Sequence, residues 1–462
     1  LLACFGLDMY YLKFLPEQPA SGIVQQAGSS DRPNVILVTL DTVRAENLSL
    51  YGYEKETSPY LDSLGEKGAV FTKANAVTSW TLPSHASIFT GKYSKNHGAT
   101  ETHQKLVSSE VTLAELLEQQ GYRTAGFVAG PYCKAKYGLA QGFQLYHDRL
   151  DFFEYRHTHD PLSIKRVFDF ASMDFREFLM QSDGERGAPE INEDIRTWLD
   201  REDERPFFLF INYFDAHDPY DRGLEYRSKF TSEQQDDDYL NQLVRSYYFD
   251  PEGRYKVRNI DPSLRDYLVA MYDTEIYYLD YYFHQLLEDL RKRKLLDNTL
   301  LVITSDHGEE FFEHGGVMHK QTLYQEVLDV PLIFYFPAKI PASRVNTRVS
   351  IVDIFPTVLS LLGMEVPQDI DGKDLSPLMQ GEPVDLGRPY VLSERYARPE
   401  HGESELRAIT GDAWKYIEVN PEQERMPTGL YDLERDPGEQ ENLYSKDQTK
   451  LDEMKGLLEE IR

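Results

Sequence analysis

Five continuous apolar runs constrain the fold of this chain more than any other feature. Each has the pattern of a strand buried on both faces, and they lie at 34–41, 122–130, 206–218, 298–308 and 330–337. Helical patterns lie between them, at 112–121 and 264–296. Strands that alternate with helices predict an α/β fold, with a mostly parallel central sheet covered by helices on both faces.

Polar side chains follow three of these strands at their carboxyl ends, namely Asp41, His217, Asp306 and His307. Ligands of such sheets bind beyond these ends. Carboxylate and imidazole together suit Zn, Mn or a similar divalent ion. One Asp-His pair after a strand is more often a turn with a hydrogen-bonded histidine. Asp41, at a second strand end, favours the metal site instead.

The stretch "SWTLPSHASIFTGKYSKNHG" (79–98) predicts a helix that starts beside Thr81. Pro83 suits a first helical turn, where its missing N–H costs nothing. Thr81 therefore lies where a helix aims free N–H groups at an anion. Its hydroxyl is either a helix cap or, if it touches a metal, an activated nucleophile.

The charge balance excludes one class of partner. The 462 residues include 49 basic and 78 acidic side chains, a net charge of −29. A polyanion is repelled before contact, so we expect no nucleic-acid partner. The only two cysteines, Cys4 and Cys133, exclude a disulfide framework and a cysteine-rich zinc site.

The first 33 residues predict an apolar stub, "LLACFGLDMYYLKFL", followed by a polar linker. The stub is too short to span a bilayer. It fits the remnant of a membrane anchor or signal segment, a lipoprotein box at Cys4, or a helix packed on the domain. We expect an extracytoplasmic, membrane-anchored protein, with a soluble protein as the alternative.

Two further boundaries divide the rest of the chain. Residues 34–341 are predicted as the catalytic domain. Insertions at about 147–205 and 219–262, rich in Tyr, Phe and acids but poor in periodicity, are predicted to cap the sheet as lids. Residues 342–462 are predicted to form a smaller C-terminal subdomain with a short antiparallel sheet and a final helix.

Several motifs in order carry a family resemblance. They begin with "NVILVTLDTVRAENLSLYGY" and "TSWTLPSHASIFTG", and continue through "FDAHDPY", "VITSDHGEEFFEHG", "TLYQEVLDVPLI" and "LYDLERDPGEQENL". Over residues 34 to 443 the chain resembles the sulfatase-like branch of the alkaline phosphatase superfamily. The resemblance implies the alkaline-phosphatase-like α/β sandwich.

The resemblance also implies roles for individual residues. It makes Asp41, Asp306 and His307 ligands of one divalent ion (Zn, Mn or Ca), with room for a second. Thr81 takes the nucleophile position and also touches the metal. His217 and His319 match histidines that contact the transferred group or protonate the leaving oxygen.

Two departures from the family pattern matter. Sulfatases have a cysteine at position 81, oxidised to formylglycine, in a Cys-x-Pro-x-Arg pattern; this chain has Thr81, and His85 replaces the arginine, so we retain His85 as a catalytic candidate. The paired acids after the first strand are reduced to Asp41 and Thr42. Thr42 and Arg44 either support the site or form a capping hydroxyl and a surface ion pair.

Chemistry at Thr81 separates the possible reactions. A formylglycine hydrate expels sulfate by breaking its own C–O bond, whereas a threonine sulfate has no such escape. A phosphothreonine can be attacked again at phosphorus. The sequence therefore predicts a metal-dependent hydrolase or transferase that cleaves phosphomonoester, phosphodiester or phosphonate bonds of small-molecule, lipid or glycan substrates through Thr81. The alternatives are a sulfatase without formylglycine and a catalytically silent binding domain.

Overall fold

The computed structural model describes residues 32–148, 186–233, 259–398, 402–423 and 425–461, together with Leu240, Val244 and Ser246. The predicted apolar stub and its linker up to residue 31 lie outside the described residues. So do residues 149–185, most of the first predicted lid, and most of 234–258 in the second. Among the residues that the structure describes, no helix is both long enough and apolar enough to cross a membrane.

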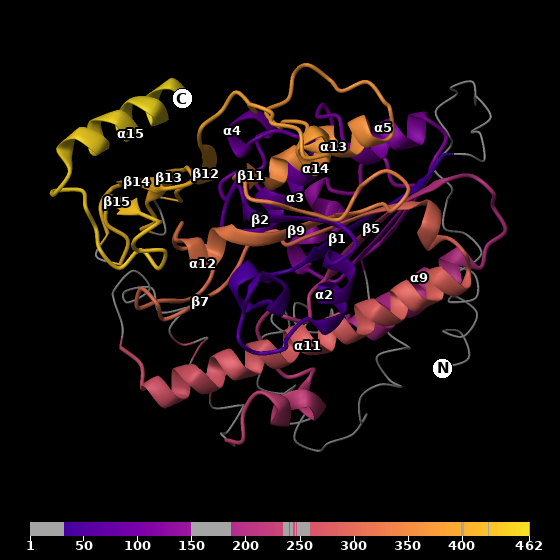
Figure 1. Ribbon diagram of the computed structural model, residues 1–462, viewed down its shortest axis with the longest axis horizontal. Coiled ribbons are helices and arrows are strands. Elements are labelled where there is room, and N and C mark those ends of the chain that lie inside the picture. The colour runs from indigo at the N-terminus through magenta and orange to yellow at the C-terminus, as the bar shows by residue number, and fades with distance from the viewer. Residues whose placement is uncertain are drawn as a thin grey trace, which may run out of the picture.

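A large, mostly parallel sheet forms the centre of the molecule (Figure 1), in the order β10-β2-β9-β6-β1-β5-β3-β4 with β11 beside β2. Its strands are β1 (Asn34–Leu40), β2 (Ala69–Asn75), β3 (Arg123–Val128), β4 (Leu145–His147), β5 (Phe207–Tyr213), β6 (Thr299–Thr304), β9 (Asp329–Tyr335), β10 (Ser343–Val345) and β11 (Val349–Ser350). The predicted α/β class is confirmed. Only β9 among these strands pairs antiparallel, with β2 and β6.

The register of the central strands aligns their carboxyl ends. Thr39 of β1 lies opposite Asn212 of β5 on one side and Thr304 of β6 on the other. Because the pairing is parallel on both sides, Asp41 and the residues that follow β6 leave the sheet at the same edge. This alignment brings the predicted strand-end side chains together.

Helices cover both faces of the sheet, because alternate residues of each strand point to opposite sides. Val35 and Leu37 belong to one hydrophobic core and Ile36 and Val38 to the other. The helices are α2 (Pro59–Gly65), α3 (Thr81–Thr90), α4 (Ser94–His97), α5 (Leu113–Gln119), α9 (Ala188–Leu199), α11 (Pro262–Lys292), α12 (Gln325–Leu328), α13 (Ile354–Leu361), α14 (Ser376–Met379) and α15 (Gln448–Ile461). Side chains of α3, α5 and α13 join the first core, and those of α2, α9 and α11 join the second. Figure 1 shows α3 and α13 on one side of the sheet and α2 and α11 on the other.

A second sheet near the C-terminus is antiparallel, as predicted. It has the order β12-β13-β14-β15, formed by Val391–Arg395, Glu405–Thr410, Trp414–Asn420 and Gly429–Asp432, and the final helix α15 packs on it. Its buried side chains, such as Ala408 and Ile417, belong to the same hydrophobic core as α3. The smaller sheet is therefore packed continuously onto the catalytic unit.

Several elements were not predicted, among them β2, α2 and α9. Helix α9 lies within the range predicted as the first lid, and its buried residues Ile191 and Ile195 pack into the core beside α11. Its apolar residues recur at helical spacing, a signal that the aromatic and acidic composition around it obscured.

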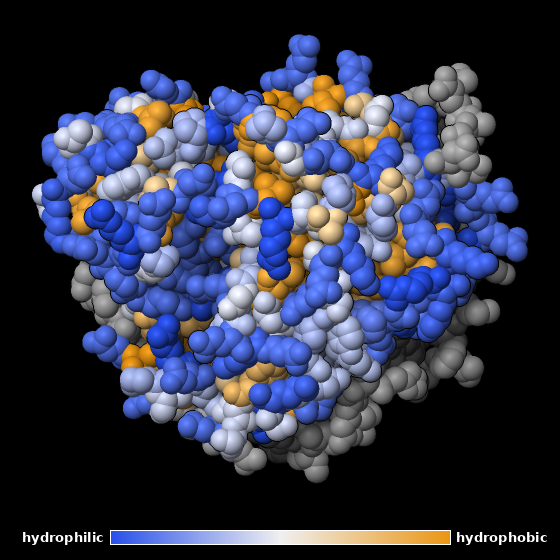
Figure 2. Space-filling model, viewed as in Figure 1, coloured by the Kyte–Doolittle hydropathy of each residue, from blue (hydrophilic) through white to orange (hydrophobic). Residues whose placement is uncertain are grey.

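The molecular surface seen in Figure 2 is largely hydrophilic, consistent with the large acidic excess.

Candidate active site

Three buried side chains gather at the carboxyl edge of the sheet. Asp41 follows β1, and Asp306 and His307 follow β6. Each offers one ligand atom, and these atoms all lie within 4.8 Å of one another. All three side chains are inaccessible to solvent. Two buried carboxylates this close repel each other unless a cation compensates them.

Backbone contacts orient these ligands. The Nδ1–H of His307 donates to the carbonyl of Gly308 at 2.9 Å, which leaves Nε2 with a lone pair for a metal. The backbone N–H groups of His307 and Thr42 donate to Oδ1 of Asp306. Oδ2 of Asp306 is buried and accepts no hydrogen bond from the described residues. Burial alone raises the pKa of Asp306, but His307 and His85 bring it below its usual value, so the carboxylate stays charged.

Thr81 is the first residue of α3, directly beside this ligand set. Its Oγ1 lies 3.3 Å from Nε2 of His307. The residue before it, Trp80, takes the cap position with an extended backbone, and no side chain caps this helix. The capping interpretation of Thr81 is therefore wrong. The hydroxyl faces the ligand set because the helix starts one residue earlier than a threonine cap requires.

His85 lies one turn further along α3 and is fully buried. Its Nδ1–H donates to the carbonyl of Thr81 at 2.8 Å, and its Nε2 lies 3.0 Å from the hydroxyl of Thr39. Nδ1 is also 3.7 Å from Oδ2 of Asp306. Burial lowers the pKa of His85, so the ring is neutral. Both ring nitrogens thus have protein partners, and His85 holds Asp306 and the start of α3 in place.

Two further histidines complete the cluster. The rings of His319 and His307 have centroids 4.4 Å apart, and those of His319 and His217 are 5.1 Å apart. Nδ1 of His319 lies 3.0 Å from Oε1 of Glu309. Burial lowers the pKa of His319 to about 4 and raises the pKa of Glu309 to about 8, so both shifts favour a neutral pair. Burial also lowers the pKa of His217 to about 3.

Sequence reasoning missed Lys320 and Glu309. The ammonium of Lys320 lies 3.8 Å from the ring centroid of Trp80, the residue before Thr81. Burial lowers the pKa of Lys320 to about 8, and the nearby Arg398 adds to the effect. Lys320 directly follows His319, and Glu309 lies two residues after His307. A charged residue close to a predicted histidine is the signal that was available.

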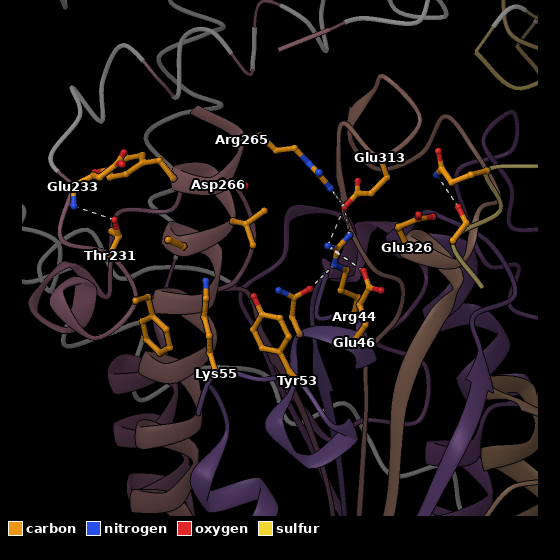
Figure 3. Close-up of a pocket in the computed structure, with 17 residues that line it drawn as sticks. Arg44, Glu46, Tyr53, Lys55, Thr231, Glu233, Arg265, Asp266, Glu313 and Glu326 are labelled. Carbon is orange, nitrogen blue, oxygen red and sulfur yellow. Dashed lines mark hydrogen bonds and ion pairs between the residues drawn. The ribbon is translucent and has the colours of Figure 1, made fainter. Parts of the chain in front are cut away.

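Of the two alternatives that the sequence left open for Arg44, the structure excludes the surface ion pair. Arg44 is buried, and its guanidinium donates to the carbonyl of Glu309 at 2.8 Å. The same guanidinium meets Glu313 and Glu46 at 3.0 Å each at the wall of a polar pocket of about 730 Å³ (Figure 3). Arg44 thus supports the backbone behind Glu309 from the side of this pocket.

Thr42 and His314 have structural partners. Thr42 has a left-handed backbone (φ 60°), and its hydroxyl donates to the carbonyl of Ala216. His314 stacks on Tyr324 with ring centroids 3.5 Å apart, and its Nε2 lies 3.4 Å from Glu326. His314 therefore does not join the histidines around Thr81. Cys133 is free and buried, with Sγ 3.6 Å from His85.

Comparison with known proteins decides the family. The family model for sulfatases matches residues 33–364. The chain belongs to the sulfatase family. A second model, for the C-terminal region of N-sulphoglucosamine sulphohydrolase, matches residues 312–462. The predicted membership of the sulfatase-like branch of the alkaline phosphatase superfamily is confirmed.

Individual sulfatase relatives match most of the chain. An N-acetylglucosamine-6-O-sulfatase from Bacteroides thetaiotaomicron is 26% identical, with 95% of this chain and 87% of that protein covered. A solved structure in complex with its substrate, D-glucosamine-2-N,6-O-disulfate, matches with a TM-score of 0.71 at 24% identity, covering 93% of this chain and 97% of the other. The phosphonate monoester hydrolase of Agrobacterium radiobacter matches with a TM-score of 0.70 at 21% identity, covering 93% and 95%. Both structures share the fold, and the chain is a sulfatase-family hydrolase.

Proposed function

We propose that this protein hydrolyses sulfate esters of a glycan. The observation that carries the proposal is the similarity to an N-acetylglucosamine-6-O-sulfatase over 95% of the chain. The match of residues 312–462 to the C-terminal region of N-sulphoglucosamine sulphohydrolase also supports it. The proposal matches the sulfatase alternative from the sequence analysis, and not the phosphoester hydrolase or transferase that the sequence predicted first.

A divalent cation fits the residues at the centre of the site. Asp41, Asp306 and His307 would hold it, and the Thr81 hydroxyl lies close enough to His307 to join them. Oδ2 of Asp306, buried and without a hydrogen-bond donor among the described residues, supports this assignment. A bound ion would polarise the ester oxygens as a Lewis acid. Zn, Mn and Ca all suit one or more of these ligands, and room for a second ion stays a prediction.

The remaining residues suit hydrolysis of an anionic ester. Lys320, beside Trp80, supplies a positive charge for the sulfate oxygens. Thr81 orients a water molecule, whose oxygen attacks sulfur while the S–O bond to the sugar breaks. His217 is neutral and takes the water's proton, because its Nδ1–H already donates to the carbonyl of Asp218.

His319 protonates the departing sugar oxygen. Its Nε2–H gives the proton, and Nδ1 recovers one from the buried Glu309 carboxyl group, with which it is in contact. The pKa of Glu309, raised by burial to about 8, supports its protonated form at neutral pH. Glu309 becomes a carboxylate in this step, and its negative charge balances the positive charge that His217 gains with the water's proton.

A phosphoester or phosphonate substrate is the second candidate, and Thr81 is the observation that favours it. A covalent phosphothreonine can be resolved by water or an acceptor alcohol, whereas a threonine sulfate lacks the escape that formylglycine provides. The two candidates share every other residue of the site and differ in the atom attacked and in the role of Thr81.

A substrate panel separates them. Purified protein, supplied in turn with Zn, Mn and Ca, is assayed on aryl sulfate, phosphomonoester, phosphodiester and phosphonate esters, and on glucosamine 6-sulfate. Sulfate release from the sugar without mass added to the Thr81 peptide supports the main proposal. Turnover confined to phosphorus esters, with 80 Da trapped on Thr81 after a phosphomonoester, overturns it in favour of the second candidate. No turnover of any ester restores the silent-domain alternative.

The predicted placement outside the cytoplasmic membrane remains a separate prediction. It depends on the apolar stub at residues 1–15, which lies outside the described residues. Fractionation of cells that produce the full-length protein tests it.

A further inference from the structure

The hairpin that carries His319 and Lys320 is short and backbone-strained. Two-residue strands β7 (Glu310–Phe311) and β8 (Val317–Met318) pair antiparallel. The residues on either side of His319 have left-handed backbones, with φ 66° at Met318 and 75° at Lys320. Residues other than glycine avoid this left-handed region, so such a conformation persists only where surrounding contacts impose it.

Arginines near the C-terminal sheet supply these contacts. Nε of Arg395, the last residue of β12, donates to the carbonyl oxygen of Lys320. The same guanidinium donates to the carbonyl of Ser404 at 2.7 Å and pairs with Glu403 at 3.2 Å. Arg395 is fully buried. It therefore fixes the backbone of Lys320 from a rigid strand.

Arg425 holds the two sides of the hairpin together. Its guanidinium donates to the carboxylate of Glu310 in β7 and to the side-chain carbonyl of Gln321 beyond β8. A Cβ on Gly316 would fall 1.6 Å from Cζ of Arg425, so the hairpin turn lies directly against the guanidinium. Thr322 donates to the same Glu310 carboxylate at 3.0 Å.

Further contacts continue along the next residues of the chain. The backbone N–H of Leu323 contacts Sδ of Met426, and that of Gln325 donates to Glu439 at 2.6 Å. From Lys320 to Gln325, the segment after His319 is thus bound by the C-terminal subdomain. The ligand set is held differently, at the edge of the large sheet. The backbone N–H of Asp41 donates to the carbonyl of Tyr213, and the side-chain amide of Asn212 donates to the Asp41 carboxylate. The backbone N–H of Thr42 donates to Asp306.

We infer that Arg395 and Arg425 are positioning residues for the reaction. From the C-terminal subdomain they hold the hairpin so that His319 lies beside His307 and Lys320 lies over Trp80. The inference rests on the proposed function, in either of its two candidate forms. By this inference the C-terminal subdomain contributes to catalysis by positioning the hairpin, whereas the metal ligands are positioned without it.

The direct test uses Arg395→Met. Glu403 keeps a partner in this variant, because Arg398 also pairs with it. We expect kcat to fall about 10- to 100-fold, as for loss of other orienting contacts around an active site. The affinity for Zn or Mn, measured by calorimetry, should stay within about twofold, since the ligand set is positioned separately. Arg407→Met is the matched control. Arg407 pairs with Glu405 of its own strand and with Glu394 of β12, and neither partner belongs to the hairpin, so the kcat of this variant should match the parent's.

A spectroscopic signal reports the hairpin without any substrate. In a Trp198→Phe/Trp414→Phe background, Trp80 is the remaining tryptophan, and the Lys320 ammonium lies over its ring. Lys320→Met calibrates the emission change that follows loss of the ammonium. Arg395→Met should move the Trp80 emission at least halfway to that value. If no ester is turned over by the parent protein, this signal still tests the positioning role.

A second variant guards against a folding defect. Glu310→Gln/Arg425→Met removes both charges of the buried pair and leaves no uncompensated carboxylate. It should reproduce the fall in kcat, the retained metal affinity and the Trp80 change. Parental kcat and parental emission in both folded variants overturn the inference. Loss of metal affinity in step with activity overturns it as well, because the hairpin would then not be positioned independently.

Discussion

The ligand set (Asp41, Asp306 and His307) and the β7–β8 hairpin meet at one reaction centre but are built differently. The ligand set follows long, fully buried parallel strands whose residues pair one to one. The hairpin has two-residue strands and left-handed residues on both sides of His319, and depends on contacts from the C-terminal subdomain. The comparison teaches that the candidate metal site is a property of the central sheet, whereas the proposed proton delivery and anion binding depend on a distant part of the chain.

The largest expected effect is at the ligand set. Asp306→Asn keeps the shape of the side chain but removes the charge that compensates a cation. We expect metal affinity to be lost and turnover to fall on the order of 10³-fold or more, measured by calorimetry and initial rates. Retained metal affinity in this variant would contradict the assignment of Asp306 as a ligand.

Thr81→Ala removes the hydroxyl group that lies beside His307 of the ligand set. We expect turnover to fall by more than about 10²-fold, as for loss of one preorganised group at a reacting centre. The fold should stay intact, since no cap is lost, with the free energy of unfolding changed by about 1 kcal/mol or less. Thermal unfolding and initial rates measure both. Parental turnover would show that the hydroxyl has no role in the reaction.

Glu309→Gln tests proton delivery by His319, on the hairpin side of the site. The amide retains the shape of the contact with His319 but cannot resupply its proton. We expect kcat to fall about 10- to 100-fold with metal affinity unchanged. Substrates with a good leaving group, such as nitrophenyl esters, should be least affected, because they need no proton. An equal loss for all leaving groups would argue against proton delivery by this pair.

The smallest effect is a pH dependence at Lys320. Burial, with Arg398, lowers the pKa of Lys320 to about 8, so the ammonium is charged below that pH and neutral above it. KM for an anionic ester should therefore rise as the pH increases beyond 8, by up to roughly tenfold per pH unit. Lys320→Met is the control, and should show a raised KM at lower pH without this rise. The same alkaline rise in both proteins would assign it to another group.

Local sequence patterns were sufficient for the sheet edge. Apolar runs ending at Asp41 and before Asp306 and His307 predicted the buried strands and the meeting of these residues. The reason is that parallel strands with both faces buried have few alternative arrangements, so residues at their ends converge. The motif around Thr81 likewise predicted the start of α3 within one residue.

Only the tertiary structure decided the surroundings of these residues. His85 and His319 were both predicted as catalytic histidines, yet His85 is buried on α3 and His319 follows a short, strained hairpin strand. The sequence contained Arg395 and Arg425, but nothing local connects them to Lys320, Glu310 or Gln321, which lie at least 75 residues away. Burial and charge pairing depend on which segments pack together, and this packing determines whether a polar side chain is a ligand, a brace or a surface group.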